Sequence, residues 1–161
     1  MSKPLVVILM GSIADEEHCL KISKACEDLG LDVDLRVGSA HKTAHYVLDM
    51  LDQYEANPRP KVYITVAGRS NALSGLVDGY VQAPVIACPP VSGTFGGADI
   101  FSSLRMPSGI SPAVILEPEN AALLAARIFA IHDTGVREAV RLYKEQHIEK
   151  VVNSDRELYS K

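Results

Sequence analysis

Five apolar runs, separated by segments with helical periodicity, constrain the fold of this chain more than any other feature. Four of the runs are nearly continuous rather than alternating, and the exception is the second along the chain. Continuous apolar runs are typical of strands that are buried on both faces of a parallel sheet. The runs are LVVILM (5–10), VDLRV (33–37), KVYITVA (61–67), PVIAC (84–88) and PAVILE (112–117).

The segments between the runs carry helix signals. Apolar residues recur every three or four positions over 15–29 and 43–55, and Gly30 supplies a stop signal after the first of these segments. Residues 119–133 are apolar nearly all round and predict a buried helix, with Thr134 as N-cap of a last helix that runs to about residue 150. The alternation predicts a three-layer αβα fold, flavodoxin-like, with a doubly wound parallel sheet of about five strands and a C-terminal helix.

Composition and charge narrow the possible functions. The 161 residues, 47% of them hydrophobic and 22% charged, predict one globular domain over 1–161. A net charge of −4 argues against a nucleic-acid partner. The three cysteines show no C-x-x-C spacing and predict reduced packing thiols, while the first apolar run is too short for a signal peptide or a membrane span. We therefore expect a cytoplasmic protein with no membrane partner.

Polar residues follow the predicted strands, at the sheet edge where doubly wound folds bind their ligands. After the first strand, Gly11 and Ser12 open a helix whose free amides favour an anion, and Asp15 can accept hydrogen bonds from sugar hydroxyls. Ser12 or Asp15 can equally well do no more than cap the helix. The segment matches neither G-x-G-x-x-G nor G-x-x-x-x-G-K-[ST], which argues against nicotinamide and nucleoside triphosphates.

The second strand is followed by GSAHKTAH, residues 38–45. Ser39 can hydrogen-bond a polar ligand, Lys42 can neutralise a phosphate, and His41 is suited to proton transfer at neutral pH. The spacing of His41 and His45 is that of a zinc helix, but Lys42 stands where such sites have glutamate. We therefore predict no metal site and assign His45 to the scaffold.

The later strand ends leave more than one interpretation open. Arg69, in AGRSNALSG, can bind an anion or hold its loop through an ion pair. The glycine-rich segment 88–99 can be a flexible cover or a plain connection, and Arg105 can serve the site or a subunit contact.

Over about residues 5–131, six motifs in order resemble the phosphoribosylaminoimidazole carboxylase family of purine biosynthesis. The motifs are GSIAD, GSAHKT, VAGRSNALSG, ACPP, SSLRMPSG and NAALLAARI. One class of this family is a mutase that moves a carboxylate within N-carboxyaminoimidazole ribonucleotide. The other adds CO2 to 5-aminoimidazole ribonucleotide (AIR) and forms 4-carboxy-AIR (CAIR). Mutases usually have S-A-H-R and G-A-G-G-A-A-H-L-P-G at the second and third strand ends. Lys42 and GRSNALSG instead resemble the direct carboxylase, which also occurs in the animal bifunctional enzyme.

The resemblance implies a role for each matching residue. His41 matches the histidine that moves the proton at the ring carbon, and the reaction needs no metal or organic cofactor. Ala14 replaces the second serine of the usual G-S-x-S-D, so one hydroxyl is missing near the ribonucleotide. Substrate-binding positions are matched by Ser12, Asp15, Ser39 and Lys42 in the phosphoribosyl pocket and by Gly68 and Ser70 in the third-strand loop.

Relatives form symmetric assemblies with sites at subunit junctions, which implies a homo-oligomer, with an octamer favoured over a tetramer. Three alternatives remain open at this stage. One is the N5-CAIR mutase reaction on the same fold, and another is a non-catalytic homologue weakened at Ala14. The third is a flavodoxin-like protein that binds flavin mononucleotide, which is disfavoured by the absence of Trp, by 6% aromatic residues and by the lack of a Ser/Thr-rich phosphate loop.

Overall fold

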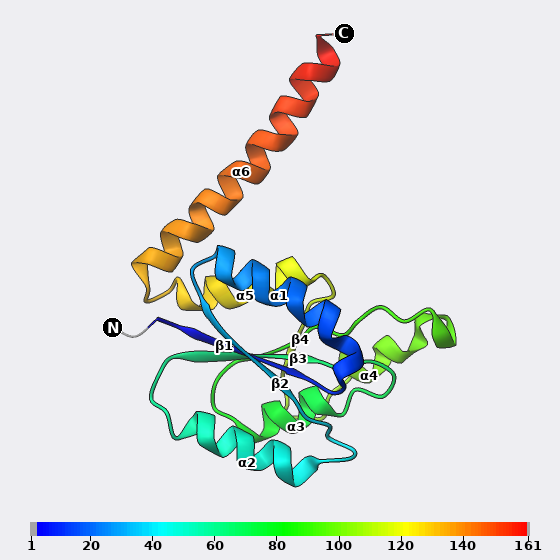
Figure 1. Ribbon diagram of the computed structural model, residues 1–161. Helices are drawn as coiled ribbons and strands as arrows, with labels where there is room; N and C mark the ends of the chain where they lie inside the picture. The colour runs from blue at the N-terminus through cyan, green and yellow to red at the C-terminus, as the bar shows by residue number, and fades with distance from the viewer. Residues whose placement is uncertain (1–2, 161) are drawn as a thin grey trace.

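The computed structural model describes residues 3–160 and contains a five-stranded parallel sheet in the order β2-β1-β3-β4-β5 (Figure 1). This order is that of flavodoxin-like doubly wound sheets, so the predicted fold class is confirmed. The strands are β1 (Leu5–Met10), β2 (Asp32–Val37), β3 (Lys61–Val66), β4 (Val85–Ala87) and β5 (Ala113–Val114).

Helices cover both faces of the sheet, with α1 (Glu16–Asp28) and α5 (Pro118–Phe129) on one face and α2 (Ala44–Glu55) and α3 (Leu73–Tyr80) on the other (Figure 1). This arrangement explains why β1 is apolar throughout. Val6 and Ile8 pack into the core under α1 and α5, while Val7 packs into the core under α2 and α3. Because successive strand residues point to opposite faces, a strand with helices on both sides must be apolar at every position.

One strand and one helix differ from the prediction. The run at 112–117 forms only the two-residue edge strand β5, in which Ala113 is exposed, so the prediction of burial on both faces is wrong there. Helix α3 was not predicted, because Gly75 and Gly79 lower helix propensity. Both glycines serve packing, since a Cβ at Gly79 would lie only 3.0 Å from Ile110 Cδ1.

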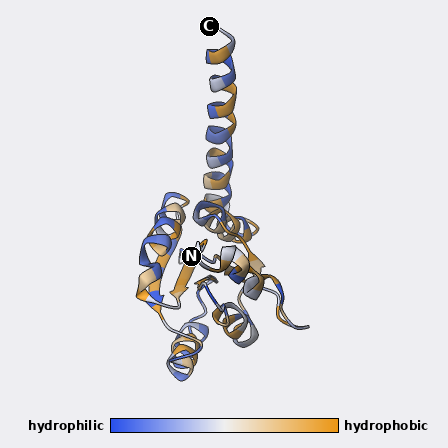
Figure 2. Cartoon of the chain, turned by 90° about the vertical axis from the view of Figure 1, so that its right-hand side faces the viewer, coloured by the Kyte–Doolittle hydropathy of each residue, from blue (hydrophilic) through white to orange (hydrophobic). Residues whose placement is uncertain are grey.

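The last helix, α6 (Thr134–Tyr159), is longer than predicted and leaves the body of the molecule (Figures 1 and 2). Its N-cap is Asp133 rather than Thr134, because the Asp133 carboxylate accepts a hydrogen bond from the Val136 N–H at 3.0 Å. Val136 and Val140 are buried against α5, whereas every residue from 144 to 160 is exposed. None of the helices within residues 3–160 combines the length and the apolar character that crossing a membrane requires.

Candidate active site

All seven residues predicted to form the site line one cavity of about 640 Å³ at the carboxyl ends of β1, β2 and β3. This volume falls within the range of about 300–1,000 Å³ that is typical of small-molecule sites. The sheet topology produces the convergence, because parallel strands deliver the loops that follow them to the same edge. The seven residues are Ser12, Asp15, Ser39, His41, Lys42, Gly68 and Ser70.

The loop after β1 contributes a hydroxyl and a carboxylate. Ser12 caps the short helix η1 (Ile13–Asp15) by accepting a hydrogen bond from the Ala14 N–H at 3.3 Å, so it has a capping role and also lines the cavity. Asp15 occupies the N-cap position of α1 without a capping hydrogen bond. Partial burial raises the pKa of the Asp15 carboxyl, and the nearby His18 and Arg69 oppose this rise. The side chain at position 14 is a methyl group on the cavity wall.

The loop after β2 is held by hydrogen bonds within the turn itself. The Ser39 N–H donates to Thr43 Oγ1 at 2.9 Å, and Ser39 Oγ accepts from the Lys42 N–H at 3.3 Å. Thr43 is the N-cap of α2 by position, but its hydroxyl bonds to Ser39 instead of capping the helix. The turn keeps His41 ahead of the helix, where it lines the cavity.

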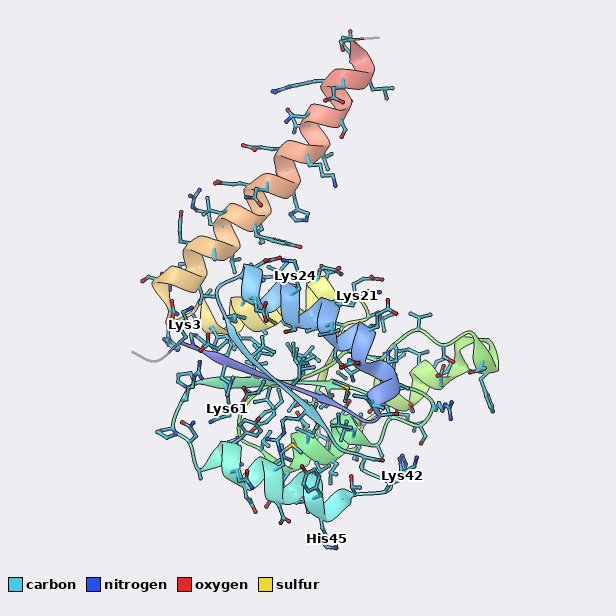
Figure 3. All side chains as sticks on the ribbon, viewed as in Figure 1. Lys3, Lys21, Lys24, Lys42, His45 and Lys61 are labelled. Atoms are coloured by element: carbon cyan, nitrogen blue, oxygen red, sulfur yellow. The ribbon has the colours of Figure 1, made fainter. Side chains whose placement is uncertain are left out.

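His45 lies on α2, outside the cavity, and its side chain points away from the domain (Figure 3). The two histidines therefore do not share a site. Over residues 3–160, no group of three or more His, Cys, Asp or Glu side chains could hold a metal ion.

The loop after β3 has an unusual backbone conformation. Arg69 adopts a left-handed conformation with φ of 59°, and its N–H donates to Asp99 Oδ2 at 3.1 Å. The next anchor is Asn71, whose N–H donates to Ser102 Oγ at 2.9 Å and whose Nδ2 donates to Ser103 Oγ at 2.9 Å. Segment 99–103 therefore holds the loop that carries Gly68 and Ser70.

Sequence reasoning missed one feature of the site and left another open. Asp99 and Asn71 fix the third loop, yet nothing in their sequence spacing marked them, because their partners lie about thirty residues away. The glycine-rich segment is more than a connection, since Pro90, Val91, Ser92 and Thr94 line the cavity. It continues into the turns of η2 (Thr94–Ile100) and the short helix α4 (Phe101–Leu104).

The three cysteines are buried and unpaired, as the sequence predicted. Burial raises the pKa of Cys19, Cys26 and Cys88 to about 12 in each case. Cys88 follows β4, and its Sγ lies 3.4 Å from Nε2 of the half-buried His18. These thiols are packing groups rather than nucleophiles.

A family model described as AIR carboxylase matches residues 5–150. The chain belongs to the AIR carboxylase family. The phosphoribosylaminoimidazole carboxylase of Treponema denticola is 57% identical and covers 97% of this chain and 98% of its own length. That of Archaeoglobus fulgidus is 51% identical, with coverage of 94% and 83%. The bifunctional phosphoribosylaminoimidazole carboxylase/succinocarboxamide synthetase of Rattus norvegicus is 45% identical over 86% of this chain, which spans 33% of the rat protein.

Solved structures of AIR carboxylase relatives share the whole fold. The crystal structure of Treponema denticola PurE matches with a TM-score of 0.96 and covers 97% of this chain and 99% of that one. A type II dehydroquinase from Propionibacterium acnes has a TM-score of 0.53 at 14% identity, which shows a related fold and nothing further.

Proposed function

We propose that this chain catalyses the carboxylation of AIR by CO2 to give CAIR, a step of de novo purine biosynthesis. The observation that carries the proposal is the meeting of all seven expected site residues in one cavity of about 640 Å³, in a chain of the AIR carboxylase family. A ribonucleotide fits such a volume, and no single loop supplies the whole set. Family membership argues against the flavodoxin-like alternative.

The chemistry needs two positioned reactants and one proton acceptor. The electron-rich ring carbon of AIR attacks CO2, a carbon–carbon bond forms, and one C=O electron pair moves onto oxygen to give a carboxylate. The ring carbon then bears both hydrogen and carboxylate, and loss of the proton to His41 restores the aromatic ring. Holding the reactants together in the cavity supplies proximity, and a positioned acid or base typically supplies about 10²–10⁴-fold in rate.

His41→Asn tests this assignment. Asparagine has a similar shape but cannot accept the proton, so we expect turnover to fall by roughly 10²–10⁴-fold while AIR binding changes little. His45→Asn is the matched control, because His45 lies outside the cavity. Near-normal turnover by His41→Asn would refute the role of His41.

Carboxylase and mutase activity are separated by the substrate supplied. We expect product from AIR with bicarbonate, and none from N-carboxyaminoimidazole ribonucleotide in CO2-depleted buffer. Lys42 and the GRSNALSG loop support the carboxylase, and the reverse pattern of products would assign the mutase.

A calorimetric titration with AIR tests whether the missing hydroxyl at Ala14 prevents ribonucleotide binding. Failure to bind AIR would indicate a non-catalytic homologue.

We also propose that the chain works as a homo-oligomer, with an octamer favoured over a tetramer. The supporting feature is the part of α6 that leaves the domain, where residues 144–160 are all exposed (Figure 2). The exposed apolar side chains there are Ile148, Val151, Val152, Leu158 and Tyr159. A helix that exposes such groups is stabilised when a second copy covers them. Light scattering should give about eight times 17.4 kDa, and a monomer mass would refute the proposal.

A cytoplasmic location completes the proposal. Three unpaired thiols suit a reducing compartment. Fractionation of cells that produce the protein would test this placement.

A further inference from the structure

Arg69 combines three features that the function proposed above does not use. It lines the cavity, its side chain is exposed, and its backbone is left-handed, a conformation that is costly for any residue with a Cβ. Strained backbone of this kind gathers at functional sites, where the surrounding structure enforces it. Here the enforcement comes from the Asp99 carboxylate, which accepts a hydrogen bond from the Arg69 N–H at 3.1 Å.

The guanidinium of Arg69 has no partner within residues 3–160. The hydrogen bonds that Arg69 makes in this range use its backbone N–H and C=O, and none of the ion pairs there includes it. An ion pair therefore does not hold the loop. Of the two roles that the sequence left open for Arg69, anion binding is the one that the contacts support.

The position of Arg69 indicates which anion it meets. The charged side chains lining the cavity are Lys42, Arg69 and Asp15, apart from the titratable His41. Lys42 follows β2 and Arg69 follows β3, the two strands that pair with β1 on either side, while Asp15 follows β1 itself. The two cations thus flank a site with a carboxylate between them. CAIR also carries two anionic groups at its two ends, the phosphate on the ribose and the carboxylate on the ring.

We propose that Arg69 binds the carboxylate formed from CO2, with Asp99 as the residue that positions it. The inference rests on the proposed AIR carboxylase function. As the carbon–carbon bond forms, negative charge develops on the former CO2 oxygens, and a planar guanidinium can donate two hydrogen bonds to them. Lys42 holds the phosphate, which AIR and CAIR share. Arg69 is therefore a catalytic residue that distinguishes the two ligands.

The test compares AIR and CAIR affinities by calorimetric titration with and without Arg69→Gly, in the His41→Asn background, because that background should bind CAIR without converting it to AIR and CO2. Glycine removes the guanidinium and accepts the left-handed backbone without strain. We expect CAIR affinity to fall by about 10- to 100-fold while AIR affinity changes by less than about 3-fold. Arg69→Lys should recover part of the CAIR affinity. Equal weakening of both ligands, or of neither, would overturn the proposal.

Two lysine variants serve as controls for the comparison of AIR and CAIR affinities. Lys42→Gln should weaken AIR and CAIR to the same extent, because the phosphate is common to both ligands. Lys61→Gln should weaken neither, because Lys61 lies at the far end of the sheet from Lys42 (Figure 3). Failure of the unmodified enzyme to convert AIR would sink the proposed function itself, whereas the ratio of CAIR to AIR affinities tests Arg69 separately.

Asp99 is tested through its dependence on Arg69. Asp99→Ala removes the acceptor of the Arg69 N–H and should lower the CAIR-to-AIR affinity ratio by about 3- to 10-fold, whereas Asp99→Asn keeps an oxygen acceptor and should restore it. In the Arg69→Gly background, Asp99→Ala should change the ratio no further. A persisting effect there, or equal losses in Asp99→Ala and Asp99→Asn, would overturn the positioning role.

Discussion

Gly38, the first residue of the GSAHK segment, offers a sharp test of how the site is packed. It is buried between β2 and the turn that carries His41. An added Cβ would lie 2.6 Å from Val47 Cγ2 on α2 and 3.5 Å from Leu9 Cδ1 on β1. The Gly38 backbone lies outside the left-handed region, so the requirement for glycine is one of space rather than of conformation.

The expected cost of Gly38→Ala follows from this geometry. The contact with Val47 would be about 0.8 Å shorter than the 3.4 Å at which ordinary van der Waals contact begins. Val47 cannot rotate away easily, because a valine in a helix has one strongly preferred χ1 rotamer. Overpacking of this kind costs about 1–3 kcal/mol. A loss of about 2 kcal/mol corresponds to a fall of roughly 4–8 °C in the thermal midpoint of a chain of this size.

A double-mutant cycle with Val47→Ala isolates the clash. Val47→Ala alone should cost about 2–3 kcal/mol, because it removes two buried carbon atoms and leaves a small cavity. The added methyl of Gly38→Ala fits into that cavity, so the double variant should lose at least about 1 kcal/mol less than the sum. Circular dichroism melts of the four proteins measure this coupling.

Gly93→Ala is the control for the cycle, because a Cβ at Gly93 would have no atom within 4 Å. Its φ of −78° is accessible to alanine, so we expect no loss of stability. Additive losses for Gly38→Ala and Val47→Ala would refute the packing argument.

Three further predictions concern titration and buried polar groups. Asp15→Asn should raise the thermal midpoint at pH 7, because an ionised carboxyl whose pKa is raised in the native state destabilises that state at pH 7. The gain in thermal midpoint should shrink as the pH falls through the pKa of Asp15 and the carboxyl becomes protonated. Ellman's reagent should leave Cys19, Cys26 and Cys88 unmodified in the native protein and label all three after unfolding; labelling of native protein would contradict their burial. Asn71→Ala should destabilise by about 1–3 kcal/mol in urea titrations, because the buried Ser103 hydroxyl loses its donor; an unchanged midpoint would show that the network contributes nothing.

The sheet was predictable because its signal is local. Each of β1, β2 and β3 begins and ends within one residue of the predicted run. Burial on both faces makes β1 apolar at every position, and such a run is visible in the sequence alone. Strand β2 lies at the other edge of the sheet, and its alternating run was visible although Leu35 and Val37 are exposed. Edge strand β5 lacks this constraint, because it pairs only with β4 and Ala113 faces solvent. The strand predicted from the apolar run at 112–117 is therefore longer and more buried than the observed β5.

The residues that form the site were also predictable, but the hydrogen bonds that fix its third loop were not. Parallel topology brings the three strand ends together, so residues such as Ser12, His41 and Ser70 had to meet once the fold was right. The contacts from Asp99 to Arg69 and from Ser103 to Asn71 join segments about thirty residues apart. No periodicity or motif encodes such pairs, since the intervening turn geometry decides which polar groups meet.

The three loops of the cavity differ in how they are fixed, and this difference bears on mechanism. The β1 and β2 loops are closed by hydrogen bonds within the loop, such as that from the Ala14 N–H to Ser12 Oγ. The β3 loop is instead tied to segment 99–103, which follows Gly96 and Gly97 with their left-handed backbone. The same glycine-rich segment also lines the cavity. A ligand that reorders this segment would therefore act on Arg69 through Asp99, whose carboxylate accepts the hydrogen bond from the Arg69 N–H.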